Sequence, residues 1–218
     1  LFKWLTINKH LAANPAQYLT LPKLPKHVAR GISKSKRDQL LEDAKGAPRD
    51  YAIMMVLSDT SARVGGIAGI TLEDIEELDR GIVYVTEKGD ATRPVFLLSD
   101  TIEAIQRYLK ARPDIPECDY LWIGKPQGKH RNGKRGRLTE SGIYQMLKRR
   151  AKRLKIKKGF NPHNFRHGSI KGMLDNGMPL PAASQIAGHS STRVTGDIYG
   201  LYAEEYLKEL HNRCSWLK

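Results

Sequence analysis

Residues 163–200 combine several side chains that could bind and cleave a phosphodiester. They include His163-Asn164-Phe165-Arg166-His167, then Gly188-His189-Ser190-Ser191, then Asp197-Ile198-Tyr199-Gly200. A guanidinium offers a planar fork of donors to two phosphate oxygens, an imidazole titrates near neutral pH, and a phenol can attack phosphorus to form a covalent ester. On a helix, His163 and Arg166 would project from one face because they are three residues apart. The spacing therefore predicts a phosphate-binding site.

An upstream arginine and a choice of nucleophile belong to the same prediction. Arg63 follows an apolar helix in a turn rich in small residues, where a ligand can approach the backbone closely. Tyr199 is the candidate nucleophile, and Tyr202 and Tyr206 are nearby competitors. A phenol has a pKa near 10, so attack at neutral pH requires a base and cationic surroundings.

A metal-dependent reaction is the alternative chemistry. It would place clustered carboxylates and Mg²⁺ at the phosphate. The acidic run within residues 73–77 lies just past the Arg63 turn, and we interpret it as the solvated end of a helix. Cys118 and Cys214 are far apart and lack metal-ligand spacing, which indicates reduced thiols. We therefore expect no metal ion and no cofactor.

The order of these motifs resembles the tyrosine recombinase (phage integrase) family. That family has an arginine in a Thr-Gly-Leu-Arg-like turn, a lysine in a β-hairpin, His-x-x-Arg-His, Gly-His-Ser-Ser and then tyrosine. The counterparts here are Thr60-Ser61-Ala62-Arg63, Glu87-Lys88-Gly89, His163 to His167, Gly188 to Ser191 and Tyr199-Gly200. The resemblance spans essentially the whole chain. It implies the catalytic residues Arg63, Lys88, His163, Arg166, His189 and Tyr199, with His167 structural.

The resemblance also gives a role to Lys88, and the chain differs from the family's pattern at two positions. Lys88 lies 25 residues after Arg63 in a predicted hairpin turn, where it would donate a proton to the leaving 5′-oxygen. A glutamate commonly stands three residues after the family's first arginine, and here that position is Gly66. Leu201 follows Gly200 where the family commonly has histidine. The contact that the glutamate makes is therefore either lost or supplied elsewhere.

A strongly basic segment indicates a polyanionic partner. The net charge is +14, and residues 125–158 hold fourteen Lys or Arg against a single acid, Glu140. A solvated helix face usually interleaves both signs of charge, so we predict that this segment contacts double-stranded DNA. The candidate DNA-binding residues are Lys125, Lys129, Arg131, Lys134, Arg135, Arg137, Lys148, Arg149, Arg150, Lys152 and Arg153.

The hydrophobic pattern predicts a mainly α fold with a small antiparallel β-sheet (α+β), and the resemblance implies the catalytic-domain fold of the family. Helices are expected at residues 2–12, after Ser33, before Ser61, between Ser99 and Pro113, after Thr139, and at 163–176, 180–187 and 203–213, with a hairpin turning at Gly89-Asp90. Residues 1–20 resemble the end of the family's N-terminal core-binding domain. Residues 21–31 are a proline-containing linker, and residues 32–218 form the catalytic domain.

The resemblance implies a site-specific DNA recombinase or integrase. It would cleave DNA through a 3′-phosphotyrosine, release a 5′-hydroxyl that joins a partner strand, and act as a homotetramer on two DNA sites through the helix from Ala203. Integration, excision, resolution and transposition all stay open. The alternatives are a type IB topoisomerase-like enzyme and a non-catalytic DNA-binding relative. No stretch approaches roughly 20 apolar residues and no signal peptide is evident, so we expect a cytoplasmic, nucleoid-associated protein and no membrane partner.

Overall fold

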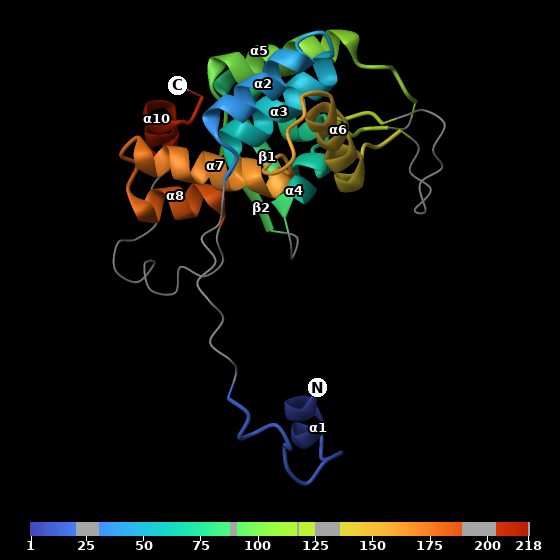
Figure 1. Ribbon diagram of the computed structural model, residues 1–218, viewed down its shortest axis with the longest axis vertical. Coiled ribbons are helices and arrows are strands. Elements are labelled where there is room, and N and C mark those ends of the chain that lie inside the picture. The colour runs from blue at the N-terminus through green and yellow to red at the C-terminus, as the bar shows by residue number, and fades with distance from the viewer. Residues whose placement is uncertain (21–30, 88–90, 117, 125–135, 189–203, 218) are drawn as a thin grey trace.

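The structure, a computed structural model, describes residues 1–20, 31–87, 91–116, 118–124, 136–188 and 204–217 (Figure 1). Its helices and strands are α1 (Phe2–Ile7), α2 (Lys34–Ala44), α3 (Pro48–Thr60), α4 (Val64–Gly69), β1 (Ile82–Glu87), β2 (Ala91–Phe96), α5 (Ser99–Ala111), α6 (Glu140–Arg153), α7 (Pro162–Asp175), α8 (Leu180–Ala187) and α10 (Glu204–Cys214), with short 3-10 helices η1 (Glu73–Ile75) and η2 (Leu78–Arg80). The predicted fold class is confirmed, since these residues are mainly helical with one two-stranded antiparallel sheet.

Helix α3 lies at the centre of the fold. Every residue from Ala52 to Thr60 is buried. Helices α2 and α5 pack on one side of α3 and α7 on the other (Figure 1). Tyr108 of α5 stacks on the fully buried Trp122 with ring centroids 5.4 Å apart, in the same hydrophobic core. A helix enclosed in this way cannot shift without opening closely packed contacts, so its end fixes the turn that follows.

Strands β1 and β2 form the predicted hairpin. The register places Ile82 opposite Phe96 and Glu87 opposite Ala91. Strand β1 packs against α4 and buries Val85 in the main core. The hairpin thereby brings Glu87, the last residue of β1, beside the short helix that follows α3.

A second hydrophobic cluster joins α7, α8 and α10. It contains Met173, Ile186 and Leu210, one from each helix. Beyond α10, Trp216 covers α7 so closely that a Cβ added at Gly172 would lie 2.3 Å from the indole ring. The C-terminal segment therefore packs on α7 of its own chain.

The N-terminal helix is shorter than predicted. The pattern suggested residues 2–12, but α1 ends at Ile7. The Asn8 side chain donates to the Trp4 carbonyl oxygen at 2.9 Å, and Lys9 has φ 58 in the left-handed region. An asparagine that bonds a helix carbonyl in this way competes with the next helical turn. Helix α1 buries no side chain, and Trp4 is 59% exposed.

Both cysteines, Cys118 and Cys214, are buried and unpaired, as the sequence indicated. Within the described ranges, no helix has both the length and the apolar character needed to cross a bilayer.

Asp59, near the end of α3, joins this helix to α10 through a buried polar pair. His211 Nε2 lies 3.0 Å from Asp59 Oδ1 and 3.0 Å from the Asp59 carbonyl oxygen. The carboxylate also accepts from the Leu98 amide at 2.7 Å and from Ser215 Oγ at 2.9 Å. Burial acts to lower the pKa of His211, but the Asp59 carboxylate outweighs it and holds the pKa above the ordinary 6.5.

We expect this pair to make folding stability fall as the pH rises. A histidine whose pKa is raised on folding contributes stability that is complete below its unfolded pKa and lost as the pH rises through its folded pKa. Urea unfolding of the wild type and of His211→Gln, from about pH 5.5 to about pH 9, measures the effect. The difference in unfolding free energy between the two proteins should shrink with rising pH. A difference independent of pH would contradict this assignment.

Candidate active site

The turn between α3 and α4 presents the first predicted arginine. Helix α3 ends at Thr60, its C-cap Ser61 has a φ of 54 in the left-handed region, and Arg63 is the N-cap of α4. The Arg63 side chain is 41% exposed. Its guanidinium is therefore accessible to a ligand, although its backbone is fixed by two helices.

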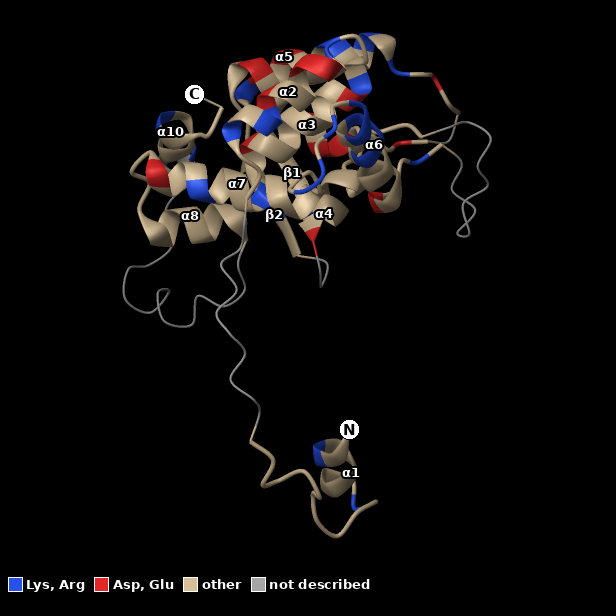
Figure 2. Cartoon of the chain, viewed as in Figure 1, with Lys and Arg blue, Asp and Glu red and all other residues tan. Residues whose placement is uncertain are grey.

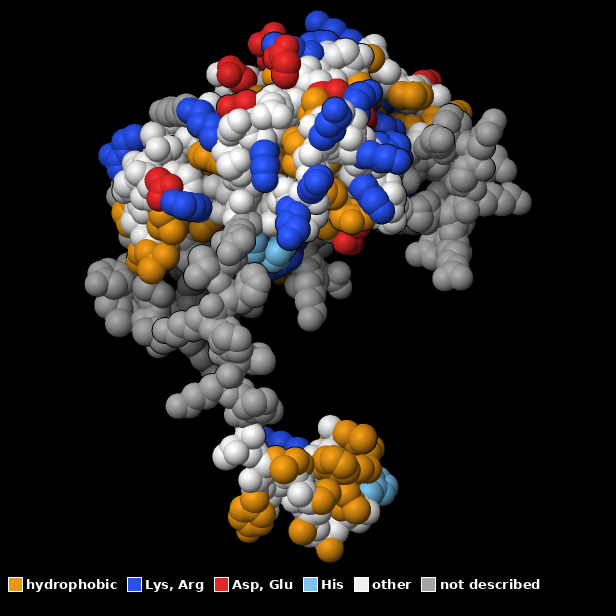
Figure 3. All heavy atoms as spheres, in the orientation of Figure 1, with side chains coloured by type: hydrophobic (Ala, Val, Ile, Leu, Met, Phe, Trp, Pro, Cys, Tyr) orange, Lys and Arg blue, Asp and Glu red, His pale blue; other side chains and the backbone are white. Residues whose placement is uncertain are grey.

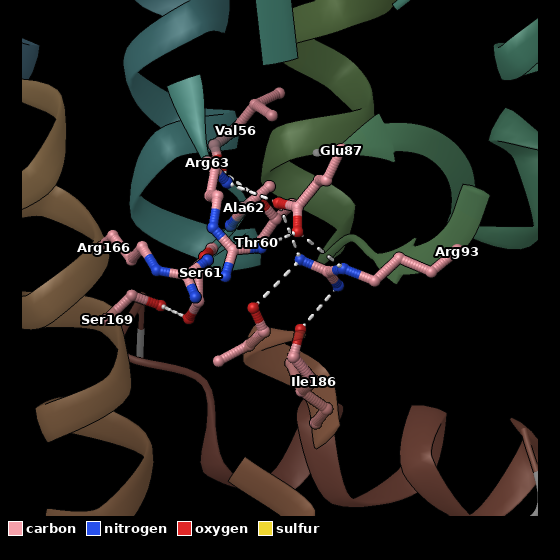
Figure 4. Close-up of polar contacts among 11 residues, drawn as sticks. Val56, Thr60, Ser61, Ala62, Arg63, Glu87, Arg93, Arg166, Ser169 and Ile186 are labelled. Atoms are coloured by element: carbon pink, nitrogen blue, oxygen red, sulfur yellow. Dashed lines mark hydrogen bonds and ion pairs between the residues drawn. The ribbon is translucent and has the colours of Figure 1, made fainter. Parts of the chain in front are cut away.

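Helix α7 brings the second predicted arginine to the same turn. Arg166 is only 4% exposed, and its Nη1 donates to the Ser61 carbonyl oxygen. The hydroxyls of Ser61 and Ser169 lie 2.7 Å apart and form a second contact between the turn and α7 (Figure 4). One turn therefore carries Arg63 and binds Arg166.

The two guanidinium groups are close enough to influence each other. Burial, and then the charge of Arg63, lower the pKa of Arg166 to about 10, while Glu87 acts in the opposite direction. Arg166 remains a cation at neutral pH. Like charges held together in partly desolvated surroundings are stabilised by a bound anion.

The hairpin contributes an acid and an arginine that the sequence analysis did not select. Glu87, whose side chain is 5% exposed, accepts from the Arg63 amide at 2.8 Å and from the Arg63 guanidinium. Arg93 Nη2 lies 3.3 Å from the same carboxylate. Arg93 also donates to the carbonyl oxygens of Ile186 at 2.6 Å and Ala187 at 3.3 Å, at the end of α8 (Figure 4). The hairpin thereby connects α4 to α8.

The sequence contained an indication that an acid such as Glu87 was needed, but none for Arg93. A helix N-cap amide is commonly bound by a glutamate three positions later, and Gly66 occupies that position in α4. The Arg63 amide therefore needed another acceptor. Burial acts to raise the pKa of Glu87, but the Arg63 amide and the Arg93 charge outweigh it and hold that pKa below the ordinary 4.5. Arg93 gave no signal, because an arginine on a strand is ordinarily a solvated surface residue.

The side chains of Arg63, Glu87 and Arg166 border a pocket of about 510 Å³. The lining residues are Ala62, Arg63, Val64, Gly65, Gly66, Thr86, Glu87, Glu140, Pro162, His163 and Arg166. His163 is exposed in the first turn of α7, which an asparagine capping box initiates. Its ring meets the His167 ring edge-on, with centroids 4.2 Å apart. Of the predicted catalytic residues, the structure thus brings Arg63, His163 and Arg166 to one pocket.

The other predicted catalytic residues, Lys88, His189 and Tyr199, lie outside the described residues. The same holds for the predicted DNA-binding residues Lys125, Lys129, Arg131, Lys134 and Arg135.

The acidic run near the Arg63 turn has a local structural role. Asp74 accepts from the amide and the hydroxyl of Thr71, each at 2.8 Å, and Glu77 pairs with Arg80. In the part of the chain that the structure describes, no three His, Cys, Asp or Glu side chains gather as a metal-binding group.

The described members of the predicted DNA-binding set differ in exposure. Lys148, Arg149 and Lys152 are exposed on α6, whose ribbon is coloured for several lysine and arginine residues in Figure 2, and Figure 3 shows basic side chains on that side of the molecule. Arg153 is 62% exposed and pairs with Asp43. The Arg137 guanidinium lies 4.3 Å from the centroid of the Tyr120 ring.

The expectation that Arg150 contacts DNA is corrected by its burial. Its side chain is 9% exposed, and its guanidinium lies 2.7 Å from both Asp43 Oδ2 and Asp50 Oδ2, which links α6 to α2 and α3. A count of charges along the sequence does not separate the two faces of a helix. Arg150 follows Ile143 and Leu147 by seven and three residues, so helical periodicity could have placed it on the buried face.

A mainly helical domain with a pocket lined by two arginines and a histidine, and with exposed basic residues on α6, suits an enzyme that acts on DNA. The chain belongs to the phage integrase family, whose pattern it matches over residues 31–205. It is a site-specific tyrosine recombinase, an enzyme that exchanges DNA strands.

Several Xer recombinases resemble the chain along most of its length. The tyrosine recombinase XerC of Leptospira interrogans is 27% identical, over 97% of this chain and 67% of that protein. XerD of Pseudomonas aeruginosa is 30% identical, over 93% of this chain and 67% of that protein. The crystal structure of XerA recombinase is 30% identical and covers 94% of this chain and 70% of its own, with a TM-score of 0.67. XerH bound to palindromic difH, at 19% identity and a TM-score of 0.64 over 88% of this chain and 57% of its own, shares the fold.

Replacing Arg150 with alanine should destabilise the domain by about 3 kcal/mol, because two aspartates would lose a shared buried partner. The Asp43 and Asp50 side chains are only 13% and 14% exposed. The exposed neighbour Arg149 provides a matched control, and Arg149→Ala should change the free energy of unfolding by less than about 0.5 kcal/mol. Urea unfolding measures both. Equal losses would show that Arg150 has no special structural role.

Proposed function

We propose that this recombinase cleaves one DNA phosphodiester per protomer with Tyr199, without a metal ion or cofactor. The Tyr199 hydroxyl passes its proton to a base, for which His163 and His189 are the candidates, and its oxygen forms a bond to phosphorus while the bond from phosphorus to the 5′-oxygen breaks, which leaves a 3′-phosphotyrosine. Lys88 gives a proton to the departing 5′-oxygen. In the reverse direction the 5′-hydroxyl of a partner strand attacks the phosphotyrosine and displaces the tyrosine, so the strand rejoins without ATP.

The pocket that contains Arg63, Arg166 and His163 carries this proposal. Guanidinium groups on the non-bridging oxygens would stabilise the charge that develops on phosphorus in the transition state. Arg166 is already oriented by the Ser61 carbonyl and by burial, so little reorganisation is needed during the reaction. His163 is exposed beside it and is placed to bond a phosphate oxygen or to transfer a proton.

The residues that precede Lys88 and His189 in the chain support an active site at this pocket. Glu87 directly precedes Lys88, and Gly188 directly precedes His189. Arg93 binds Glu87 and the last carbonyls of α8, so Glu87 and the end of α8 that leads to Gly188 are both held close to the pocket. A Cβ at Gly188 would lie 2.5 Å from Arg93 Nε, which shows how closely the two segments pack.

Double-stranded DNA is the partner that fits the exposed basic residues of α6. XerH, which shares this fold, has been solved on its DNA substrate in a post-cleavage complex. We infer that this chain acts as a homotetramer on two DNA sites. Helix α10 would then pack on a neighbouring protomer, because the surface of α7 and α8 that it covers can accept the same helix from another copy.

The same proposal divides the chain by function. Residues 1–20 would belong to a preceding core-binding domain, residues 21–31 would link it, and residues 32–218 would form the catalytic domain. Such an enzyme is expected to work in the cytoplasm on nucleoid DNA.

A nicked suicide substrate that contains the cognate site tests the nucleophile. Wild-type protein should form a covalent complex with DNA in the presence of EDTA, and Tyr199→Phe should form none. Arg166→Lys keeps the charge but loses the planar fork, so it should slow trapping by about 100-fold. Gel separation under denaturing conditions measures the yield, and peptide mapping identifies the linked residue.

Each other outcome of this trapping experiment has a definite meaning. Trapping retained by Tyr199→Phe would move the nucleophile to Tyr202 or Tyr206, and cleavage abolished by EDTA would overturn the metal-free mechanism. Relaxation of supercoiled DNA without recombinant product would favour a topoisomerase-like enzyme. No trapping on a verified site would favour a non-catalytic DNA-binding relative.

DNA affinity should depend steeply on salt. With about six to ten phosphate contacts, affinity should fall roughly 10³- to 10⁵-fold between about 50 and about 200 mM salt. The triple variant Lys148→Gln/Arg149→Gln/Lys152→Gln should reduce the slope of log affinity against log salt by about 3. Lys110→Gln, an exposed lysine on α5, serves as the control and should leave the slope unchanged. A flat salt response of the wild type would remove α6 as a DNA-binding surface.

A further inference from the structure

The amide of Arg63 is bound by an acid from a distant part of the chain. The first amides of a helix lack intrahelical acceptors, and a glutamate at the third helical position often reaches back to bond the N-cap amide. In α4 the N-cap is Arg63 and the third position is Gly66, which has no side chain. The acceptor is instead Glu87 Oε1, at 2.8 Å, from a residue 24 positions away in sequence.

Gly66 and Glu87 share one space. A Cβ added at Gly66 would lie 3.2 Å from Glu87 Cγ and 3.3 Å from Val85 Cβ, closer than ordinary van der Waals contact. A side chain at position 66 would therefore displace the Glu87 side chain or the strand behind it. The absence of a side chain at Gly66 therefore provides the space that the Glu87 side chain occupies.

We propose that Glu87 is a positioning residue for Arg63, and that it supplies from the hairpin the contact that a glutamate at position 66 would supply from the helix. The inference rests on the proposed function, in which Arg63 binds the scissile phosphate. Gly66 and Glu87 then form a matched pair, and changing both together should preserve what changing either one removes.

The geometry suits a positioning role better than simple charge neutralisation. Glu87 accepts hydrogen bonds from both the backbone amide and the guanidinium of Arg63, so it restrains the backbone of that residue and the end of its side chain. The Glu87 carboxylate also pairs with Arg93, which shares its negative charge. Arg93 is in turn held by the C-terminal carbonyls of α8, where the helix dipole favours a cation. Arg63 can therefore be restrained by an acid and still attract a phosphate.

The hairpin origin of this acid has a consequence for the site. A glutamate at position 66 would hold Arg63 from within α4, whatever the hairpin did. Glu87 immediately precedes Lys88, so the strand that leads to the proposed proton donor also sets the position of the first arginine. The two catalytic groups are thereby coupled through one strand end.

An exchange of the two residues tests the pairing. The variants are Glu87→Gly, Gly66→Glu, the double variant Gly66→Glu/Glu87→Gly, and the conservative Glu87→Gln. Glu77→Gln is the control, because Glu77 is an ion-paired acid that does not line the pocket. The measurements are the single-turnover rate of covalent trapping at saturating suicide substrate, the Kd for DNA, and Tm.

We expect Glu87→Gly to slow trapping by about 100-fold while Kd changes less than about threefold, since a charge-assisted contact to Arg63 is lost. Glu87→Gln should fall between this variant and the wild type. The double variant should recover at least about tenfold over Glu87→Gly, because its new glutamate can close a capping box with the Arg63 amide. The Glu77→Gln rate should equal that of the wild type.

Two results would overturn the inference: a wild-type trapping rate for Glu87→Gly, or a double variant no faster than the slower single variant. A loss of activity that follows only the folded fraction would make Glu87 merely structural and would also overturn it. If the wild type itself forms no covalent complex, the proposed function fails, and Tm alone then tests whether Gly66 and Glu87 act as a pair. The Tm of the double variant should be higher than the sum of the Tm changes of the two single variants predicts. Strictly additive Tm changes would refute the pairing.

Discussion

The contact between α7 and the turn at Ser61 is the constraint on which the rest of the site depends. Ser61 holds a left-handed conformation that a residue with a side chain rarely adopts, and its carbonyl and hydroxyl are both bound by α7. Because the turn follows a helix whose residues from Ala52 to Thr60 are all buried, α7 can dock only where Arg166 and Ser169 find these partners. A shift would leave a buried guanidinium without its acceptor, which costs more than a lost surface contact. The contacts that set the fold therefore also set the spacing of the two arginines.

The charge balance of the pocket follows from the same packing. Arg63 and Arg93 both pair with the buried Glu87, and Arg166 lies close enough for the charges of all three to act on it. Burial and mutual repulsion lower the pKa of Arg166, so the folded protein holds these cations closer together than water would favour. A phosphodiester would relieve part of that repulsion. In the proposed function, this arrangement of cations would favour the binding of a phosphate in the pocket.

The sequence predicted the parts of this site that depend on local spacing. Arg166 and His163 share a helix face, which short-range periodicity predicts, whereas Arg63, 103 residues before Arg166, was grouped with them by the resemblance to the tyrosine recombinase family. Glu87 and Arg93 depend on how a hairpin docks against α4 and α8, and that information is not present in any short stretch of sequence. The absent glutamate at position 66 indicated only that a partner was needed. Arg150 was misassigned because a count of charge ignored the helical period that places it among apolar residues.

In the proposed tetramer, helix α10 would connect assembly to this site through α3. Asp59 binds His211 of α10, and it stands two residues before Ser61, whose carbonyl orients the second arginine. In the proposed tetramer, an exchanged α10 would bring His211 from another protomer to the same carboxylate, so the buried pair would be remade rather than lost. Exchanging α10 between protomers would change the free energy little, because the same pair forms again. During the exchange, however, the buried pair between Asp59 and His211 would break, near the end of α3 and the turn at Ser61. An isolated protomer and an assembled one would then present the same arginines, while a protomer whose α10 is undocked would leave Asp59 buried without its partner. In the proposed tetramer, that single carboxylate would link assembly to the geometry of the arginines.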